Sequence, residues 1–174
     1  YRIINETVRE RLGGLHSARL ILYSVDFHDI ERMQQAGDWA QAGHVLARAA
    51  CVLEAAGADG LVLCTNTMHR VAPAIEAAVT LPLLHIAAPT AQAIRRADVT
   101  TVGLLGTRFT MEEDFYRRRL TDRRGLTVIV PAPADRATAH RVIYDELCRG
   151  QAREDARVHY HRIGVTCRAA GLAH

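Results

Sequence analysis

The sequence predicts an α/β protein, in which parallel sheets are flanked by helices. Two short, mainly apolar runs at residues 61–64 and 101–106 are typical of strands buried on both faces. Such runs alternate with segments of helical periodicity, which favours parallel strands joined through helices. Each run also ends in small polar residues and leads into a helical segment. We therefore predict two α/β lobes of similar build, at residues 1–98 and 99–174.

The first lobe is expected to open with a helix, because Ile4, Val8 and Leu12 recur at helical spacing. Asp38 precedes a long apolar-faced segment and is expected to cap the longest helix of this lobe. The other expected elements are a strand at 19–25, a short helix within 26–37, a strand at 61–64, a helix at 67–78 that Pro73 kinks or shifts, a strand at 81–86 and a helix at 89–97.

The second lobe repeats the alternation. Thr110 and Glu113 have the spacing of a capping box, and Asp135 is expected to cap a later helix. Gly150 separates that helix from the last one. The elements expected are a strand at 101–106, a helix to about residue 122, a strand at 126–130, and helices at 135–149 and 152–170.

Composition and charge exclude several classes of protein. The chain of 174 residues is 49% hydrophobic and 24% charged, which is typical of a folded globular protein. A net charge of +3 is too small to predict nucleic-acid binding, and we interpret the basic run at 117–124 as a solvated helix face. No apolar run is long enough to span a membrane. Four scattered cysteines and nine histidines form no zinc-site spacing, so we expect a reduced, cytoplasmic protein without a metal.

The turn after residues 61–64 is the candidate site. The strand leads directly into Thr65, Asn66 and Thr67, and a helical pattern with His69 begins there. Ligands of open α/β sheets collect at the carboxyl ends of strands, where helix N-termini attract anions. Hydroxyl, amide and imidazole groups at this point predict a site for a small molecule that carries a carboxylate.

These residues resemble a motif of the aspartate/glutamate racemase superfamily, most closely its broad-specificity amino-acid racemase branch. That family has a Cys-Asn-Thr-x-His signature after a strand of lobe one, and in this branch Thr replaces the Cys, as Thr65 does here. Three further stretches support the resemblance, at residues 23–27, 84–87 and 102–112.

The resemblance implies a cofactor-independent racemase with two pseudo-symmetric lobes, each of which supplies one acid/base residue to the α-carbon. Thr65 would be the lobe-one acid/base. Asn66 and Thr67 would bind the substrate carboxylate, and Gln34 would contact the substrate. Thr107, which ends the matching strand of the second lobe, is expected either to contact the carboxylate or amine of the substrate or to cap the helix that follows. We treat His69 as either a structural hydrogen-bond partner or a proton relay. The implied partner is a small amino acid, and some family members are homodimers.

The sequence also departs from the family pattern. The family's second catalytic residue is a Cys in a late Gly-Cys-Thr-Glu motif, and none of the four cysteines has that context. We therefore expect the first strand of lobe one and the last strands of lobe two to be missing, and the chain to hold one acid/base residue of two. The alternatives are a small-dicarboxylate isomerase or decarboxylase of the same superfamily, which Thr65 disfavours, and a non-catalytic protein that only binds an amino acid.

Overall fold

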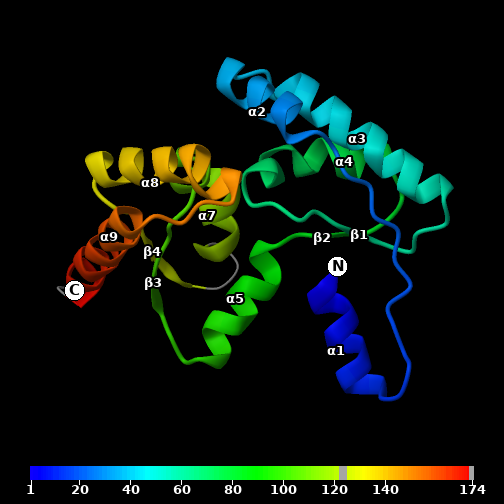
Figure 1. Ribbon diagram of the computed structural model, residues 1–174, viewed down its shortest axis with the longest axis horizontal. Helices are drawn as coiled ribbons and strands as arrows, with labels where there is room; N and C mark the ends of the chain where they lie inside the picture. The colour runs from blue at the N-terminus through cyan, green and yellow to red at the C-terminus, as the bar shows by residue number, and fades with distance from the viewer. Residues whose placement is uncertain (122–124, 173–174) are drawn as a thin grey trace. The chain divides into compact units, whose positions relative to one another are not determined.

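The computed structural model describes residues 1–121 and 125–172, and Figure 1 traces their helices and strands along the chain. Their contacts divide into two compact units, which are described separately. Unit 1 comprises Tyr1–Leu61 and Ala74–Pro82, and unit 2 comprises Val62–Pro73 and Leu83–His174. The fold is α/β, mostly helical with small sheets. The predicted lobe boundary at residues 98/99 stays a prediction.

Unit 1 is built mainly from helices whose positions follow the sequence pattern. Helix α1 (Arg2–Leu12) ends at Gly13, and α2 (Phe27–Ala36) packs against α3 (Trp39–Ala55). Asp38 caps α3, as predicted, because its Oδ1 accepts a hydrogen bond from the Gln41 backbone N–H at 3.0 Å. The buried apolar side chains of this pair of helices are Ile30, Ala42, Leu46 and Ala50.

The strand predicted at residues 19–25 is wrong. This segment has no regular secondary structure, and its apolar side chains Leu20, Ile21, Leu22 and Tyr23 are 37% to 72% exposed. A strand exists only through hydrogen bonds to a neighbouring strand. Within residues 1–121 and 125–172, no segment pairs with residues 19–25. An apolar run alone therefore does not specify a strand at residues 19–25.

Residues 61–84 contain a short sheet, a 3-10 helix and an α-helix. Strands β1 (Leu61–Val62) and β2 (Leu83–Leu84) form a two-stranded sheet within the predicted runs, although both are shorter than predicted. After β1 comes the 3-10 helix η1 (Thr67–Val71), and α4 (Ala72–Ala78) follows directly. Pro73 is the second residue of α4, where its missing N–H costs nothing. Of the two expected effects of Pro73, the shift of the helix start is the one observed.

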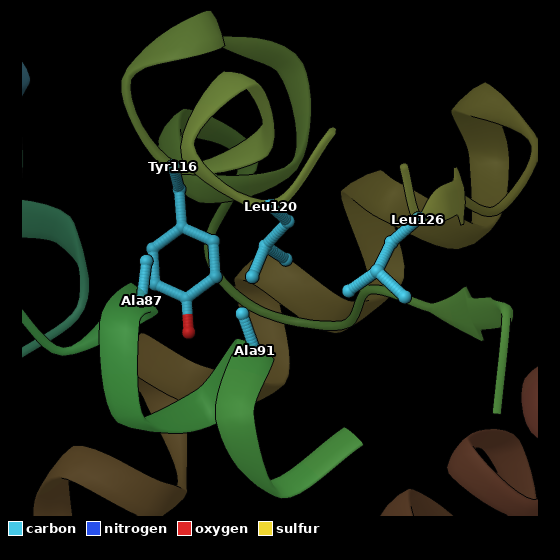
Figure 2. Close-up of a cluster of buried hydrophobic side chains, with 5 residues drawn as sticks. All are labelled: Ala87, Ala91, Tyr116, Leu120 and Leu126. Atoms are coloured by element: carbon cyan, nitrogen blue, oxygen red, sulfur yellow. The ribbon is translucent and has the colours of Figure 1, made fainter. Parts of the chain in front are cut away.

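Unit 2 contains a parallel sheet of β3 (Thr101–Gly103) and β4 (Thr127–Ile129), with Val102 opposite Val128. Five buried side chains form a hydrophobic cluster beside it. In Figure 2, Tyr116 and Leu120 of α7 (Asp114–Thr121) face α5 (Ala87–Arg96), and Leu126 precedes β4. The remaining elements are α6 (Arg108–Glu112), α8 (Pro133–Asp145), the 3-10 helix η2 (Leu147–Arg149) and α9 (Glu154–Leu172).

Two capping predictions in unit 2 are wrong. The cap of α6 is Thr107, whose hydroxyl accepts a hydrogen bond from the Thr110 N–H at 3.4 Å, so Thr110 and Glu113 form no capping box. Helix α8 starts at Pro133, ahead of Asp135. Asp135 instead pairs with Arg162 of α9 at 2.5 Å. In both cases a helix began earlier than the polar residue that was expected to cap it.

The basic run of residues 117–124 is partly paired with acid. Asp114 forms ion pairs with Arg117 and Arg118, which supports a solvated helix face. Arg123 and Arg124 lie outside the described residues, as does residue 122, where the predicted helix was expected to end. None of the helices described combines the length and apolarity needed to cross a lipid bilayer.

Candidate functional site

The candidate site is the turn between β1 and η1, which belongs to unit 2. Leu61 is buried at the start of β1, and the chain becomes polar at Thr65. Thr65 is half-buried and Asn66 is exposed, whereas Thr67 is 5% exposed. The first backbone N–H groups of a helix lack acceptors within it. The turn therefore combines hydroxyl, amide and backbone donors within three consecutive residues.

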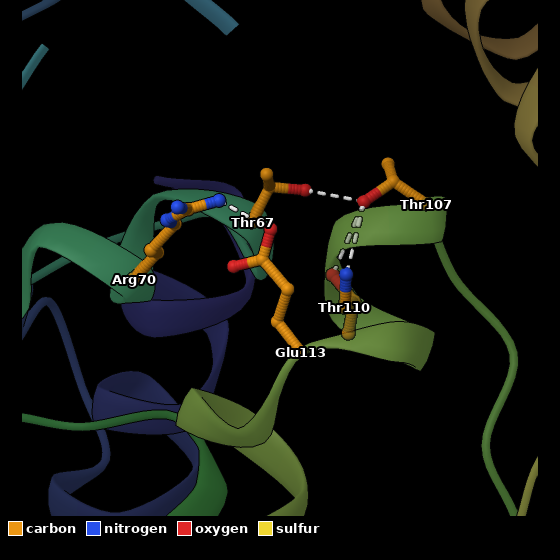
Figure 3. Close-up of polar contacts among 5 residues, drawn as sticks. All are labelled: Thr67, Arg70, Thr107, Thr110 and Glu113. Carbon is orange, nitrogen blue, oxygen red and sulfur yellow. Dashed lines mark hydrogen bonds and ion pairs between the residues drawn. The ribbon is translucent and has the colours of Figure 1, made fainter. Parts of the chain in front are cut away.

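Thr67 lies against the equivalent turn that follows β3. Its hydroxyl oxygen is 2.8 Å from the hydroxyl oxygen of Thr107, and Thr107 is in turn 3.3 Å from the Thr110 hydroxyl. Figure 3 shows Thr67 and Thr107 pointing toward each other from η1 and α6. The two similar strand-to-helix segments recognised in the sequence thus meet through their threonines.

An ion pair lies beside the threonines and links the same two elements. Arg70 of η1 donates to Glu113, the residue that ends α6 (Figure 3). Both side chains are about one-third exposed, at 31% and 32%. Burial raises the pKa of the Glu113 carboxyl, and the attraction to Arg70 offsets only part of that effect. A guanidinium already held by a carboxylate is a weak candidate for binding a second acid.

His69 is the most deeply buried polar residue of the turn, at 1% exposed. Its Nδ1 lies 2.7 Å from the Thr65 carbonyl oxygen, and the Ile86 backbone N–H donates to its Nε2 at 3.1 Å. The His85 ring packs edge-on against it at a centroid distance of 4.2 Å. Both ring nitrogens of His69 therefore face backbone groups.

The arrangement suits recognition of an anion. Charge-assisted hydrogen bonds from hydroxyl, amide and backbone N–H groups are stronger than neutral ones, so a carboxylate would gain most here. A metal is not indicated by the side chains that the structure describes, because no three or more His, Cys, Asp or Glu converge among them as ligands would. The fixed donors could also stabilise charge that develops on a bound carboxylate.

Unit 2 brings together five of the six predicted site residues: Thr65, Asn66, Thr67, Thr107 and His69. Gln34 is buried in α2 of unit 1, at 3% exposed, and its contact with a substrate stays a prediction. Sequence reasoning missed Arg70 and Glu113. Helical spacing offered a signal, since Arg70 lies three residues after Thr67 and therefore on the same face.

The four free cysteines differ in their surroundings. Cys51, Cys64 and Cys148 are exposed, and Cys167 is partly buried in α9. Cys64 is exposed because β1 ends at Val62 and Cys64 lies beyond the pairing. Burial raises the pKa of the Cys148 and Cys167 thiols. A thiol that acts as a base needs the opposite shift.

A cavity of about 380 Å³ lies elsewhere in unit 2, between β3, β4 and α9, and its lining includes Gly103, Ile129 and Cys167. None of the predicted site residues lines it. The polar members of its lining are Thr101, Cys167 and Arg168, and the other lining residues are glycines, Leu105 and Ile129. The turn after β1 therefore remains the candidate site.

Comparison with known proteins yields one family. The family model for Asp/Glu/hydantoin racemases matches residues 1–173. The chain is similar to the crystal structure of a proposed Asp/Glu racemase from Yersinia pestis, with 53% identity and a TM-score of 0.88, over 98% of this chain and 74% of that one. It is also similar to an aspartate racemase homologue from Pyrococcus horikoshii OT3, with 33% identity and a TM-score of 0.70, over 87% of this chain and 66% of that one.

Proposed function

Since the chain belongs to the Asp/Glu/hydantoin racemase family, we propose that it acts in the cofactor-independent racemisation of amino acids. The finer proposal is the broad-specificity branch, because Thr65 stands where other members carry a cysteine. The observation that carries the proposal is the hydroxyl pair of Thr67 and Thr107 beside Thr65 and Asn66. It supports the proposal because hydroxyl groups from two strand-to-helix turns meet at one point.

Removal of the α-proton from an amino acid produces a carbanion whose charge spreads onto the carboxylate. Without an electron-accepting cofactor, fixed donors must stabilise that charge. Asn66, Thr67 and Thr107 are the residues proposed for this task, with Gln34 as a further substrate contact. Their hydroxyl and amide groups can donate to the carboxylate oxygens in both the bound and the carbanion state, and the donation strengthens as charge builds.

Thr65 is the proposed acid/base of lobe one. Efficient general acid–base transfer needs a pKa near the working pH, and an unassisted threonine hydroxyl is far too weakly acidic. A partner must therefore hold the proton that Thr65 exchanges. Both His69 nitrogens face backbone groups, so a bound water is the better candidate for that partner.

Neither Cys148 nor Cys167 is an activated thiol that could serve as the second acid/base residue of a two-base racemase. The pKa values of Cys148 and Cys167 are raised, which disfavours thiolate formation near neutral pH. This observation favours a second candidate function, in which the 174 residues bind an amino acid without inverting it. The isomerase and decarboxylase alternatives are less favoured, because those branches use cysteine where Thr65 stands.

One assay separates these functions. The chain is incubated in heavy water with single enantiomers of aspartate, glutamate and alanine, and α-deuteration and optical inversion are followed by NMR and chiral chromatography. Exchange without inversion is the expected result, because Thr65 is the single acid/base residue proposed. Inversion would reveal a second base and support full racemase activity. Measurable binding without exchange would support the binding function, and an absence of both binding and exchange would overturn the proposal.

A further inference from the structure

We infer that His69 is a positioning residue that works as a neutral, Nδ1-protonated imidazole and fixes the peptide plane between Thr65 and Asn66. The inference rests on the proposed function only for its effect on turnover. The protonation state and the hydrogen bonds of His69 can be measured without any substrate.

The two backbone partners of His69 determine where its proton lies. A carbonyl oxygen can only accept, so the 2.7 Å contact with the Thr65 oxygen requires a proton on Nδ1. A backbone N–H can only donate, so the 3.1 Å contact with Ile86 requires a bare Nε2. The ring is 1% exposed, and a protonated Nε2 would turn its N–H toward the Ile86 N–H, which is itself a donor. Geometry and burial therefore favour one neutral tautomer.

The bond to Thr65 orients the donor that follows it. A trans peptide is planar, and its C=O and N–H point in opposite directions. When His69 holds the Thr65 carbonyl oxygen on its own side, the Asn66 N–H must point away from the ring. His69 thus determines the direction of a backbone donor that the proposed site would offer to a carboxylate.

The bond to Ile86 connects the turn to a second element. Ile86 is the residue just before α5, and His85 also accepts a hydrogen bond there, from the Ala87 N–H to its Nδ1 at 3.2 Å. His69 and His85 pack edge-on, and both are buried. The imidazole of His69 therefore joins the end of β1 to the start of α5, and the turn is held from a rigid helix.

The native chain provides the first test. In a ¹⁵N-labelled sample without substrate, two-bond ¹H–¹⁵N correlation spectra identify the protonated nitrogen of each histidine. A neutral Nδ1–H ring is expected for His69, whereas His16 serves as the reference for a solvent-exposed ring. A neutral Nε2–H ring or a charged ring at neutral pH would overturn the inference.

Substitutions provide the second test. His69→Asn keeps an N–H donor near the Thr65 carbonyl, whereas His69→Phe keeps the ring shape and removes both hydrogen bonds. We expect His69→Phe to lower α-deuteration by about 10²-fold, mainly in kcat, since a small misplacement of a site costs that much. His69→Asn should recover a large part of the loss, and His16→Gln should match the native chain. Equal exchange in His69→Phe and the native chain would overturn the inference.

The two proposals fail in different ways. If the native chain exchanges no α-proton, the proposed function fails, but the tautomer of His69 is still measured. If exchange is present and His69 carries its proton on Nε2, the positioning role fails and the function stands. Should His69→Phe not fold, the NMR result on the native chain alone decides.

Discussion

At the scale of single residues, Thr65 is the side chain on which the proposed chemistry depends. We expect Thr65→Ala to lower α-deuteration by at least about 10²-fold, the usual contribution of a general acid/base. Thr65→Cys should retain or raise the rate, because a thiol has a pKa closer to the working pH. The measurement is α-deuteration of single enantiomers, with Thr80→Ala as a control on a surface threonine of unit 1. Equal rates in Thr65→Ala and the native chain would remove Thr65 from the mechanism.

The hydroxyl pair of Thr67 and Thr107 can be tested by a double-mutant cycle. Each threonine is replaced by valine, which has nearly the same shape but no hydroxyl. Because the two oxygens are 2.8 Å apart, we expect a coupling free energy of unfolding of about 1 kcal/mol between the substitutions. Urea unfolding of the native chain, both single variants and the double variant gives this value. Strict additivity would mean that the hydroxyls contribute independently.

At the scale of elements, the helices that the sequence predicted correctly are those whose signals are local. Asp38 is the clearest case, because one side chain and the following backbone specify the start of α3. We expect Asp38→Ala to reduce the free energy of unfolding by about 1 kcal/mol, the usual cost of losing such a cap. Urea unfolding measures it, and Glu76→Ala on the exposed side of α4 is the matched acidic control. A loss no larger than that of the control would contradict the capping role.

The predictions that failed depended either on a distant partner or on a choice between neighbouring residues. Residues 19–25 have the composition of a strand, but composition does not supply the neighbour that a strand needs. Thr110 and Asp135 have the chemistry of caps, yet Thr107 and Pro133 come earlier and start their helices first. Local propensity proposed several starts for each helix, and packing selected among them.

At the scale of the whole molecule, acid sensitivity should arise partly from His140. Burial, together with the nearby Arg108, lowers the pKa of His140 in the folded chain. The unfolded chain therefore takes up this proton first as the pH falls, and stability is lost below an unfolded pKa of about 6.5. We expect His140→Gln to flatten the fall in the free energy of unfolding between about pH 7 and pH 5. Urea unfolding at several pH values tests this, with His16→Gln as the control, and an unchanged slope would contradict it.

The α/β class, the alternation of elements and the turn after β1 could all be predicted from the sequence, because apolar runs and polar strand ends are visible there. Five of the predicted site residues lie in unit 2. They could be predicted because they lie at or next to the polar strand ends. The Arg70–Glu113 pair could not be predicted, since it joins positions far apart in the chain. The hydrogen bonds of His69 to backbone groups could not be predicted either, because a sequence pattern does not specify which backbone groups an imidazole contacts.

The contact between Thr67 and Thr107 has a consequence for selectivity. The two hydroxyls form a hydrogen bond with each other. A ligand that separates them must replace that hydrogen bond with stronger interactions. An apolar or weakly polar molecule would break that hydrogen bond and form only weaker interactions in its place. A carboxylate could replace that hydrogen bond with interactions to both hydroxyls at once, so we expect the proposed site to select charged molecules over apolar ones.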